Sequence, residues 1–351
     1  MKNTTVNIIY ILCIIGFYLG SQGCALNFDT DGSTLGIIEK SGELTENEVW
    51  SGRIYVTSTV IVPEGVTLTI RAGTIVGFEP ADNPSELIVH GELYAEGAPD
   101  RMIVFGSLGK QSEAKTETNL QNATSQTFTR DMLKQQFTMP TDSSTQATTA
   151  APPKAGDWQG IKIETGSPNS RLTYCRIQHA TYAIICETDT VQIERCLFSE
   201  NKIGVLCENT NPAITANEFN RNGTGAQFRG AAAPEVEYNE FNANRNGLVC
   251  EDDSRPRIQH NNIRSNYEYA IICYSTSSPE IVSNNITLNS GWAVYDGGRL
   301  RDNYISGNKL VGPNVTELSI GTQSEQFYGV DEVFDPRNSP VSEAGVPSDN
   351  F

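Results

Sequence analysis

A short pattern of apolar and polar positions recurs seven times between Leu172 and Asn308. In each copy an aliphatic residue is followed three positions later by Asn or Cys, and two positions after that by Ile or Phe. Successive copies start 21, 21, 22, 22, 23 and 19 residues apart, which is the period of a solenoid. The copies are Leu172/Cys175/Ile177, Ile193/Cys196/Phe198, Ile214/Asn217/Phe219, Val236/Asn239/Phe241, Ile258/Asn261/Ile263, Ile281/Asn284/Ile286 and Leu300/Asn303/Ile305.

A second polar column follows three residues after each Ile or Phe, and a small and then an apolar residue come after it. The apolar residues recur mostly at spacing two, which favours strands over the sustained 3.6-residue period of a helical repeat. Three short strands per unit predict a parallel β-helix in which only neighbouring coils touch. The second column consists of Ala180, Asn201, Asn222, Asn244, Asn266, Asn289 and Asn308.

The asparagine columns explain why the coils would stack. Asn tolerates the left-handed backbone conformation that a sharp bend requires, so we expect the asparagines themselves to occupy the bends. Their amides can also hydrogen-bond to the equivalent amides in the coils above and below, at ~4.8 Å per coil. We therefore assign these columns a structural role.

Segment 42–105 predicts the first two or three coils. Apolar residues alternate there with polar or small ones, and Pro63-Glu64-Gly65 and Ala72-Gly73 supply turns.

Several motifs in this half resemble the exported right-handed β-helix proteins of the pectin-lyase-like superfamily. The resemblance implies a right-handed β-helix of about ten coils over 42–311, but it indicates no activity, because the superfamily holds lyases, hydrolases, epimerases and adhesins. The motifs are Trp50-Ser51-Gly52, Pro63–Ile70, Gly73-Thr74, Gly91–Gly97, Asp157–Ile161 and, near the other end, Asp335–Gly345.

Three segments do not follow the coil pattern. Segment 107–156 is rich in Ser, Thr, Gln and Ala, so it predicts an insertion with little capacity to bury apolar surface. The island Phe128–Met139 within it could form a short amphipathic helix on the solenoid. Segment 312–351 predicts a C-terminal cap and tail.

Residues 1–23 have the pattern of an export signal, with Lys2 followed by an apolar run from Ile8 to Leu19. Gly23-Cys24 resembles the end of a lipoprotein signal, which implies a lipid on Cys24, a linker over 24–41 and a location in the periplasm or at the cell surface; simple secretion is the alternative. The formal net charge of −17 argues against nucleic acid as a partner and against anionic membrane surfaces, so contact with a membrane would be through the lipid only. It is compatible with calcium or with glycans.

Eight cysteines in an exported chain raise the question of disulfides. Cys175 and Cys196 fall in the first asparagine column, and four others share one inward strand position: Cys186, Cys207, Cys250 and Cys273. Parallel stacking aligns the Cβ vectors, which is not the usual disulfide geometry, so we expect buried free thiols. The alternative pairs are 175 with 196, 186 with 207 and 250 with 273.

The strand after the second polar column carries the candidate binding surface. Alternation places Val205 and Cys207 inside, so Leu206 and Glu208 point outward, and the other coils follow the same rule. We expect an apolar stripe there, either covered by Phe128, Met132 and Phe137 of the insertion or open as a ligand groove. Tyrosines would stack on sugar rings, and charged groups would bind hydroxyls or an acidic sugar. The candidate ligand-binding residues are Glu187, Glu208, Arg229, Glu251, Tyr274 and Tyr295.

An enzyme on the same surface is the competing hypothesis. Glu208 and Glu251 lie two coils apart, ~9.6 Å along the axis, near the upper limit for an inverting carboxylate pair. Arg229 lies between them and could act as a lyase base, with calcium on Asp189, Asp252 or Asp253. Because the arginine and paired-aspartate motifs of the superfamily's enzymes are missing, we expect a noncatalytic protein that binds a polysaccharide or a surface protein; a passive scaffold is a third hypothesis.

Overall fold

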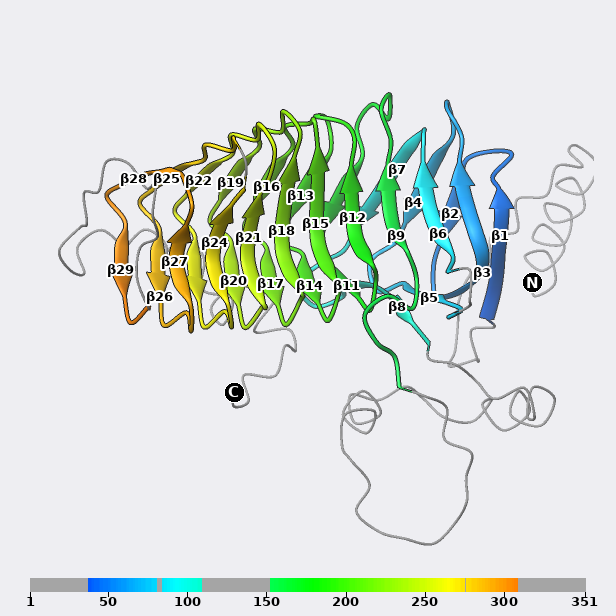
Figure 1. Cartoon of the computed structure of the whole chain (residues 1–351). Helices are drawn as coiled ribbons and strands as arrows, with labels where there is room; N and C mark the ends of the chain where they lie inside the picture. Colours follow the sequence, from blue (N-terminus) through cyan, green and yellow to red (C-terminus); the bar gives the residue numbers. More distant parts are fainter. Residues whose placement is uncertain (1–36, 81–83, 109–151, 275, 309–351) are drawn as a thin grey trace, which may run out of the picture. The chain divides into compact units, whose positions relative to one another are not determined.

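The computed structural model describes residues 37–80, 84–108, 152–274 and 276–308, and in these residues the chain winds through ten coils of a parallel β-helix (Figure 1). All regular elements in the described ranges are strands. None of the described residues belongs to a helix with the length and hydropathy of a membrane span. The predicted export signal, Cys24, the island Phe128–Met139 and the C-terminal cap lie outside these residues.

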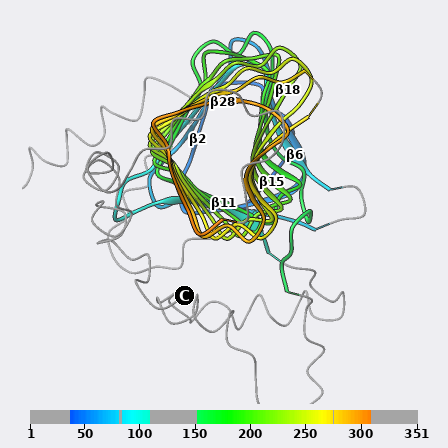
Figure 2. The same cartoon turned by 60° about the vertical axis from the view of Figure 1, so that its left-hand side comes forward.

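Each complete coil contributes one strand to each of three faces, which Figure 2 shows nearly end-on around β2, β11 and β15. The first face is a separate ten-stranded sheet in which every neighbouring pair is parallel. Its strands are β2 (Glu48–Trp50), β4 (Thr67–Ile70), β7 (Glu92–Glu96), β10 (Arg171–Thr173), β13 (Gln192–Glu194), β16 (Ala213–Thr215), β19 (Glu235–Glu237), β22 (Arg257–Gln259), β25 (Glu280–Val282) and β28 (Arg299–Arg301).

The second and third faces are joined into one 19-stranded sheet because β1 (Ile37–Glu43) and β3 (Arg53–Val62) run across both. The second face contains β5 (Ile75–Phe78), β8 (Ile103–Ser107), β11 (Cys175–Gln178), β14 (Leu197–Ser199), β17 (Glu218–Asn220), β20 (Glu240–Asn242), β23 (Asn262–Arg264), β26 (Asn285–Thr287) and β29 (Tyr304–Ser306). The third contains β6 (Glu86–Val89), β9 (Gly160–Ile163), β12 (Tyr182–Cys186), β15 (Ile203–Glu208), β18 (Thr224–Arg229), β21 (Asn246–Cys250), β24 (Tyr269–Cys273) and β27 (Trp292–Tyr295).

The predicted repeat register is confirmed residue by residue. Leu172 pairs with Ile193, which pairs with Ile214, and the same column continues without a shift to Leu300. The column also extends backward through Ala95 and Ile70. One difference concerns the start of the solenoid, because β1 begins at Ile37, inside the predicted linker 24–41, where it pairs in parallel with β3.

The asparagines form two ladders, but the residue in the left-handed conformation is the one before each column position. These preceding residues have φ between 49° and 67°, and the expectation that Asn itself takes this conformation is wrong. They are Tyr174, Arg195, Ala216, Tyr238, His260, Ser283 and Asp302 at the first corner, between the first and second faces, and His179, Glu200, Arg221, Ala243, Ser265, Leu288 and Gly307 at the second corner, between the second and third faces.

Each ladder amide is satisfied inside the protein, as Asn239 illustrates. Its Nδ2 donates to the carbonyl of Ile214 at 2.8 Å and to Oδ1 of Asn261 at 3.0 Å. Its Oδ1 accepts from the backbone N–H of Asn217 at 2.9 Å and from Nδ2 of Asn217 at 3.1 Å. The ladder therefore supplies partners to the groups that a corner removes from the strand hydrogen bonds, as buried polar groups require.

Inside the coils, side chains of one column stack on one another. The ring centroids of Phe198 and Phe219 are 4.8 Å apart, and those of Phe219 and Phe241 are 4.6 Å apart. A Cβ added to Gly204 would lie 2.8 Å from the Phe219 ring and 2.4 Å from the carbonyl oxygen of Gly225, so close packing explains the small residue that follows each second-column position.

Candidate functional site

The outer surface of the third face is concave, because two consecutive residues point inward in each coil. In β15 these are Gly204 and Val205, both buried, so the strand bends between them. The outward side chains before and after the bend consequently approach each other; the rings of Trp292 and Tyr295, which flank the bend of β27, are 5.6 Å apart. We call the residues before the bend the leading row (Tyr182, Ile203, Thr224, Asn246, Tyr269, Trp292) and those after it the trailing row (Lys162, Ile185, Leu206, Gln227, Val249, Ile272, Tyr295).

The concavity changes the prediction of an exposed apolar stripe. Leu206, Val249 and Ile272 do point outward, but only 2, 6 and 2% of their surfaces are exposed. They are packed in the bend of their strands and offer little surface to a ligand. The apolar stripe therefore contributes to the packing of the third face. The residues expected to cover it, Phe128, Met132 and Phe137, lie outside the described part of the chain.

The predicted charged ligands lie where alternation places them, and each interacts with a neighbouring coil. Glu187 lies 3.3 Å from Nζ of Lys162, and Glu208 accepts a hydrogen bond of 3.1 Å from Arg229. Glu251 accepts one of 2.8 Å from the amide of Gln227. These contacts tie successive coils together and balance much of the charge of the surface.

The three calcium candidates accept hydrogen bonds at the turns that lead back to the first face. Asp189 accepts from the backbone N–H of Asn211 at 2.5 Å and Asp252 from that of Gly230 at 3.2 Å, while Asp253 accepts from the hydroxyl of Thr276. Within the described residues, no three His, Cys, Asp or Glu side chains are grouped so that they could hold a metal ion.

An aromatic cluster occupies the third face at its C-terminal coils. It contains the predicted Tyr274 and Tyr295 together with Tyr269 and Trp292, which strict alternation would place inside; they point outward because two consecutive residues point inward at the bend of β24 and of β27. The Tyr269 and Tyr295 ring centroids are 5.4 Å apart, and the phenol of Tyr274 is 44% exposed. Desolvation, and then the negative potential of nearby groups that include Glu251, raises the pKa of Tyr274, so its hydroxyl is a donor at neutral pH.

A groove that the sequence analysis did not identify runs along the second corner. It is open, has a volume of about 770 Å³, and begins beside the residues where the chain returns from the predicted insertion. Four cationic side chains and one acidic side chain line it. The lining residues are Pro153, Lys154, Ala155, Glu200, Asn201, Lys202, Arg221, Asn222, Gly223, Thr224, Ala243, Arg245, Asn246 and Tyr267.

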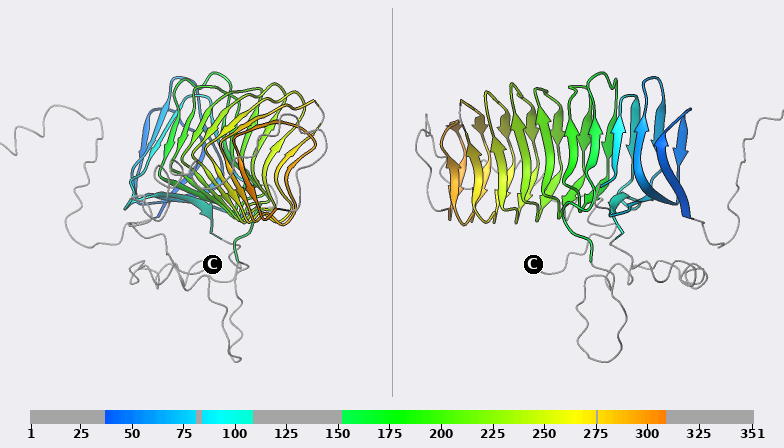
Figure 3. Two further views of the ribbon diagram at one scale, coloured as in Figure 1. Left: turned by 90° about the vertical axis from the view of Figure 1, so that its left-hand side faces the viewer. Right: turned by 45° about the vertical axis from the view of Figure 1, so that its right-hand side comes forward.

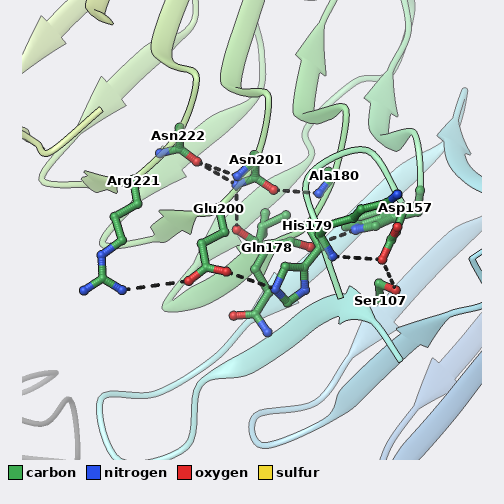
Figure 4. A network of polar contacts seen from close by, with 12 residues as sticks. Ser107, Asp157, Gln178, His179, Ala180, Glu200, Asn201, Arg221 and Asn222 are labelled. Atoms are coloured by element: carbon green, nitrogen blue, oxygen red, sulfur yellow. Dashed lines mark hydrogen bonds and ion pairs between the residues drawn. The ribbon is translucent and has the colours of Figure 1, made fainter. Parts of the chain in front are cut away.

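A polar network below this groove fixes its acidic member (Figure 4). The buried imidazole of His179 places Nε2 3.5 Å from Glu200, and the other carboxylate oxygen of Glu200 lies 3.9 Å from the guanidinium of Arg221. The hydrogen bond from His179 lowers the pKa of Glu200, which keeps the carboxylate charged. Beside it, Asp157 accepts from the hydroxyl of Ser107 at 2.9 Å and from the N–H of Lys154 at 3.0 Å, which holds the returning chain against the corner.

The cations of the groove differ in how they are paired. Arg245 forms an ion pair with Glu268, with 2.9 Å between Nε and the carboxylate, and Arg221 faces Glu200. Among the described residues, no acidic side chain pairs with the ammonium of Lys154 or Lys202. The ammonium of Lys202 instead lies over Gly156, where an added Cβ would be 2.7 Å from Nζ.

The groove continues into the aromatic cluster through the leading row. Thr224 and Asn246 line the groove, and Asn246 is in register with Tyr269, which is in register with Trp292. Within the described part of the chain, the buried Oδ1 atom of Asn246 has no hydrogen-bond partner. The basic groove and the aromatic cluster therefore lie on successive coils along the solenoid axis; Figure 3 shows the stacking of these coils.

The second face carries a different charged group. Glu218 and Glu240 are register neighbours on its outer side, and Arg264 donates to Glu240. Desolvation, and then the charge of Glu240, raises the pKa of Glu218 from 4.5 to about 7. Burial beside a second carboxylate therefore favours the protonated form of Glu218.

The six cysteines of the β-helix are buried and free. Cys186 is in register with Cys207, and Cys250 with Cys273. In the first polar column the thiols of Cys175 and Cys196 approach the carbonyls of Ala95 and Leu172 at 3.2 and 3.3 Å, where the later coils have asparagine amides. Burial is the largest cause of the raised pKa of the Cys175 and Cys207 thiols, which makes them unreactive packing groups.

Comparison with known proteins supports the architecture. Residues 159–315 match the family model for a right handed beta helix region, and together with the ten stacked coils this confirms the predicted right-handed parallel β-helix. No curated protein matches the chain.

Two solved structures are similar to the chain at low identity. The periplasmic alginate epimerase AlgG is 13% identical, with a TM-score of 0.37 over 76% of this chain and 75% of that chain. The A-module of the Azotobacter vinelandii mannuronan C-5 epimerase AlgE6 is 12% identical, with a TM-score of 0.36 over 82% and 89%.

Proposed function

We propose that this protein is an exported, noncatalytic binder of polysaccharide, and that the sugar chain lies along the axis over the aromatic cluster of the third face. The observation that carries the proposal is the cluster itself: Tyr269, Trp292 and Tyr295 are half-buried side by side, and Tyr274 projects beside them. Aromatic rings held in place by packing offer flat apolar surface to the faces of sugar rings at low entropic cost.

The polar groups beside the cluster complement sugar hydroxyls. The hydroxyl of Tyr274 donates, and the carboxylate of Glu251 has lone pairs beyond the bond from Gln227. Linear glycans extend by roughly one sugar per coil of a β-helix, so successive coils can present the same contacts to successive residues of the ligand.

The contacts of the catalytic candidates support binding over catalysis. Arg229 donates a hydrogen bond to Glu208, and Glu251 accepts one from Gln227. The candidate base and the two candidate carboxylates therefore connect neighbouring coils. A general base must reach the proton that it removes. The buried imidazole of His179 beside the groove does not meet this requirement, since only 4% of its side chain is exposed.

Export and a lipid on Cys24 complete the proposal. Their support is the apolar run followed by Gly23-Cys24. A binder tethered in this way would hold glycan at a cell-envelope surface.

Tryptophan fluorescence offers a direct test. The chain has three tryptophans, of which Trp50 and Trp158 are buried in the core, so a change in emission on titration with oligosaccharides reports Trp292. We expect saturable binding to at least one glycan, and a loss of about tenfold or more in affinity for Trp292→Ala and Tyr269→Ala by calorimetry, the effect of removing one stacking ring.

Tyr238→Ala is the matched control, because Tyr238 stacks on His260 at the first corner, away from the third face. It should bind as the natural protein does. Equal affinity in all three variants would reject the cluster as the site. Release of unsaturated or reducing ends from a bound glycan would show an enzyme instead.

A further inference from the structure

We infer that the ligand on the third face is an acidic polysaccharide, and that the groove at the second corner recognises its anionic groups. This inference rests on the proposed function and adds the chemical class of the glycan. Its basis is the local reversal of charge: four cations and one anion line the groove, whereas the whole chain has a formal net charge of −17. An anionic ligand is repelled by most of this protein and attracted at the groove.

The cations are arranged for a linear ligand. Lys202, Arg221 and Arg245 belong to three successive coils, which rise ~4.8 Å each. That repeat approximates the length of one sugar in an extended chain, so one acidic group per sugar could meet one cation per coil. A single small anion would not need cations distributed along the axis.

Two features mark the groove as prepared for a partner. The ammonium groups of Lys154 and Lys202 have no acidic partner among the described residues, although the protein is rich in carboxylates. In addition, Oδ1 of Asn246 is a buried acceptor without a donor, at the junction between the groove and the aromatic cluster. Buried polar atoms are usually paired, and a sugar hydroxyl would supply the missing donor.

Glu200 acts as a positioning residue in this arrangement. It is held by His179 on one side and orients Arg221 on the other, so it fixes a cation at the groove floor. Together with Glu268, which pairs with Arg245, the fixed carboxylate limits the net positive charge at the groove to about two. Such a modest excess suits one charge per sugar rather than nucleic acid, whose duplex carries one charge per ~1.7 Å.

Binding to four defined polymers tests the inference. The polymers are polygalacturonate, chondroitin sulfate, neutral dextran and duplex DNA, each titrated at 50 and 200 mM salt. We expect at least one of the two acidic glycans to bind about tenfold or more tighter than dextran, with an affinity that falls with salt. Lys202→Gln/Arg221→Gln should weaken this binding about tenfold or more, while Lys202→Arg retains it.

The control variant Arg71→Gln/Arg299→Gln removes the same charge from exposed positions outside the groove and should bind normally. Melting curves of all variants establish that each is folded. If dextran binds as tightly as the acidic glycans through Trp292, the inference fails while the proposed function stands. If no glycan binds, both fail, and if DNA binds as tightly as the acidic glycans, the groove is a nonspecific polyanion surface and the inference fails.

Discussion

The coils before the insertion and those after it close the same three-sided core by different means. From β10 onward, both corners have a left-handed residue followed by a ladder position, and asparagine amides connect coil to coil. In the earlier coils the left-handed positions are glycines, such as Gly52 and Gly73, and side chains such as Thr74 bond to nearby carbonyls. The later coils thus repeat one corner structure, whereas in the earlier coils the corner structure differs from corner to corner.

This difference shows where the sequence must be specific. A ladder position depends on its neighbours, because each amide bonds to the coils on both sides, so a change there affects three coils. An irregular coil depends on local packing instead, for example on the stack of Phe78 on Trp158, with centroids 3.9 Å apart. Trp158 also joins the two regions, since its indole N–H donates to the carbonyl of Gln178 at 2.8 Å.

Trp158→Ala should produce the largest effect. The side chain is fully buried, and its removal takes away the stack on Phe78 and the donor to Gln178. We expect a loss of about 3–5 kcal/mol in the free energy of unfolding, measured with denaturant. Trp292→Ala is the control, a half-exposed tryptophan that should cost less than about 1 kcal/mol by the same measurement; equal losses would contradict the role of the stack.

Asn239→Ala tests the other region, at the middle of the first ladder. It removes four hydrogen bonds, leaves the N–H of Asn217 without its acceptor and takes one donor from the carbonyl of Ile214. We expect a loss of about 2–4 kcal/mol and faster amide exchange in the coils on both sides. Asn242→Ala changes an outward asparagine three residues further on, in β20, and should stay within about 0.5 kcal/mol. Exchange that rises in one coil only would contradict a cooperative ladder.

The solenoid could be predicted from the sequence because its signal is repeated. Seven copies fix the register, and outward or inward direction then follows from alternation, as for Cys207 and Glu208. The predicted bend positions differ from the observed ones by one residue. The left-handed residue precedes each asparagine column and varies in chemical type, as Tyr238, Glu200 and Leu288 show, so it forms no recognisable sequence pattern. Strand β1 was missed because an edge strand exposed along most of its length shows no alternation.

The site could be predicted only in part. Outward alternation placed Tyr274 and Tyr295, but it said nothing about the bend that buries Leu206 and Ile272. Strand alternation does not reveal the groove, because its cations lie outside the strands: Arg221 is a left-handed corner residue, Lys202 and Arg245 directly follow ladder asparagines, and Lys154 lies at the end of the insertion. A count of charge by corner, rather than by strand, brings Lys202, Arg221 and Arg245 together.

The pH dependence of stability offers a finer test of the regular coils. Glu218 keeps its proton to about pH 7 in the folded protein, against a usual pKa of 4.5. Because the folded state binds this proton more tightly than the unfolded state, the contribution of Glu218 to stability falls as the pH rises from 4.5 through 7. Glu218→Gln should therefore be more stable than the natural protein at pH 8, by about 1–3 kcal/mol, with no such gain at pH 4.

The measurement is the difference in unfolding free energy between the two proteins across this pH range. Glu235→Gln, which removes an exposed carboxylate of β19, should follow the natural protein within about 0.5 kcal/mol. A gain that is the same at pH 4 and pH 8 would show that removal of the Glu218 proton is not the cause.

The smallest expected effects come from two arginines that each face a carboxylate in the preceding coil. Arg264 binds Glu240, whose side chain is only 5% exposed, whereas Arg301 faces Glu280, whose side chain is 49% exposed, at 3.4 Å. Arg264→Ala leaves a buried carboxylate beside Glu218 without its cation and should cost about 1–2 kcal/mol. Arg301→Ala should cost less than about 0.5 kcal/mol, because water solvates Glu280. Equal costs at the two sites would mean that the second face does not desolvate its charges, which would also remove the cause assigned to the raised pKa of Glu218.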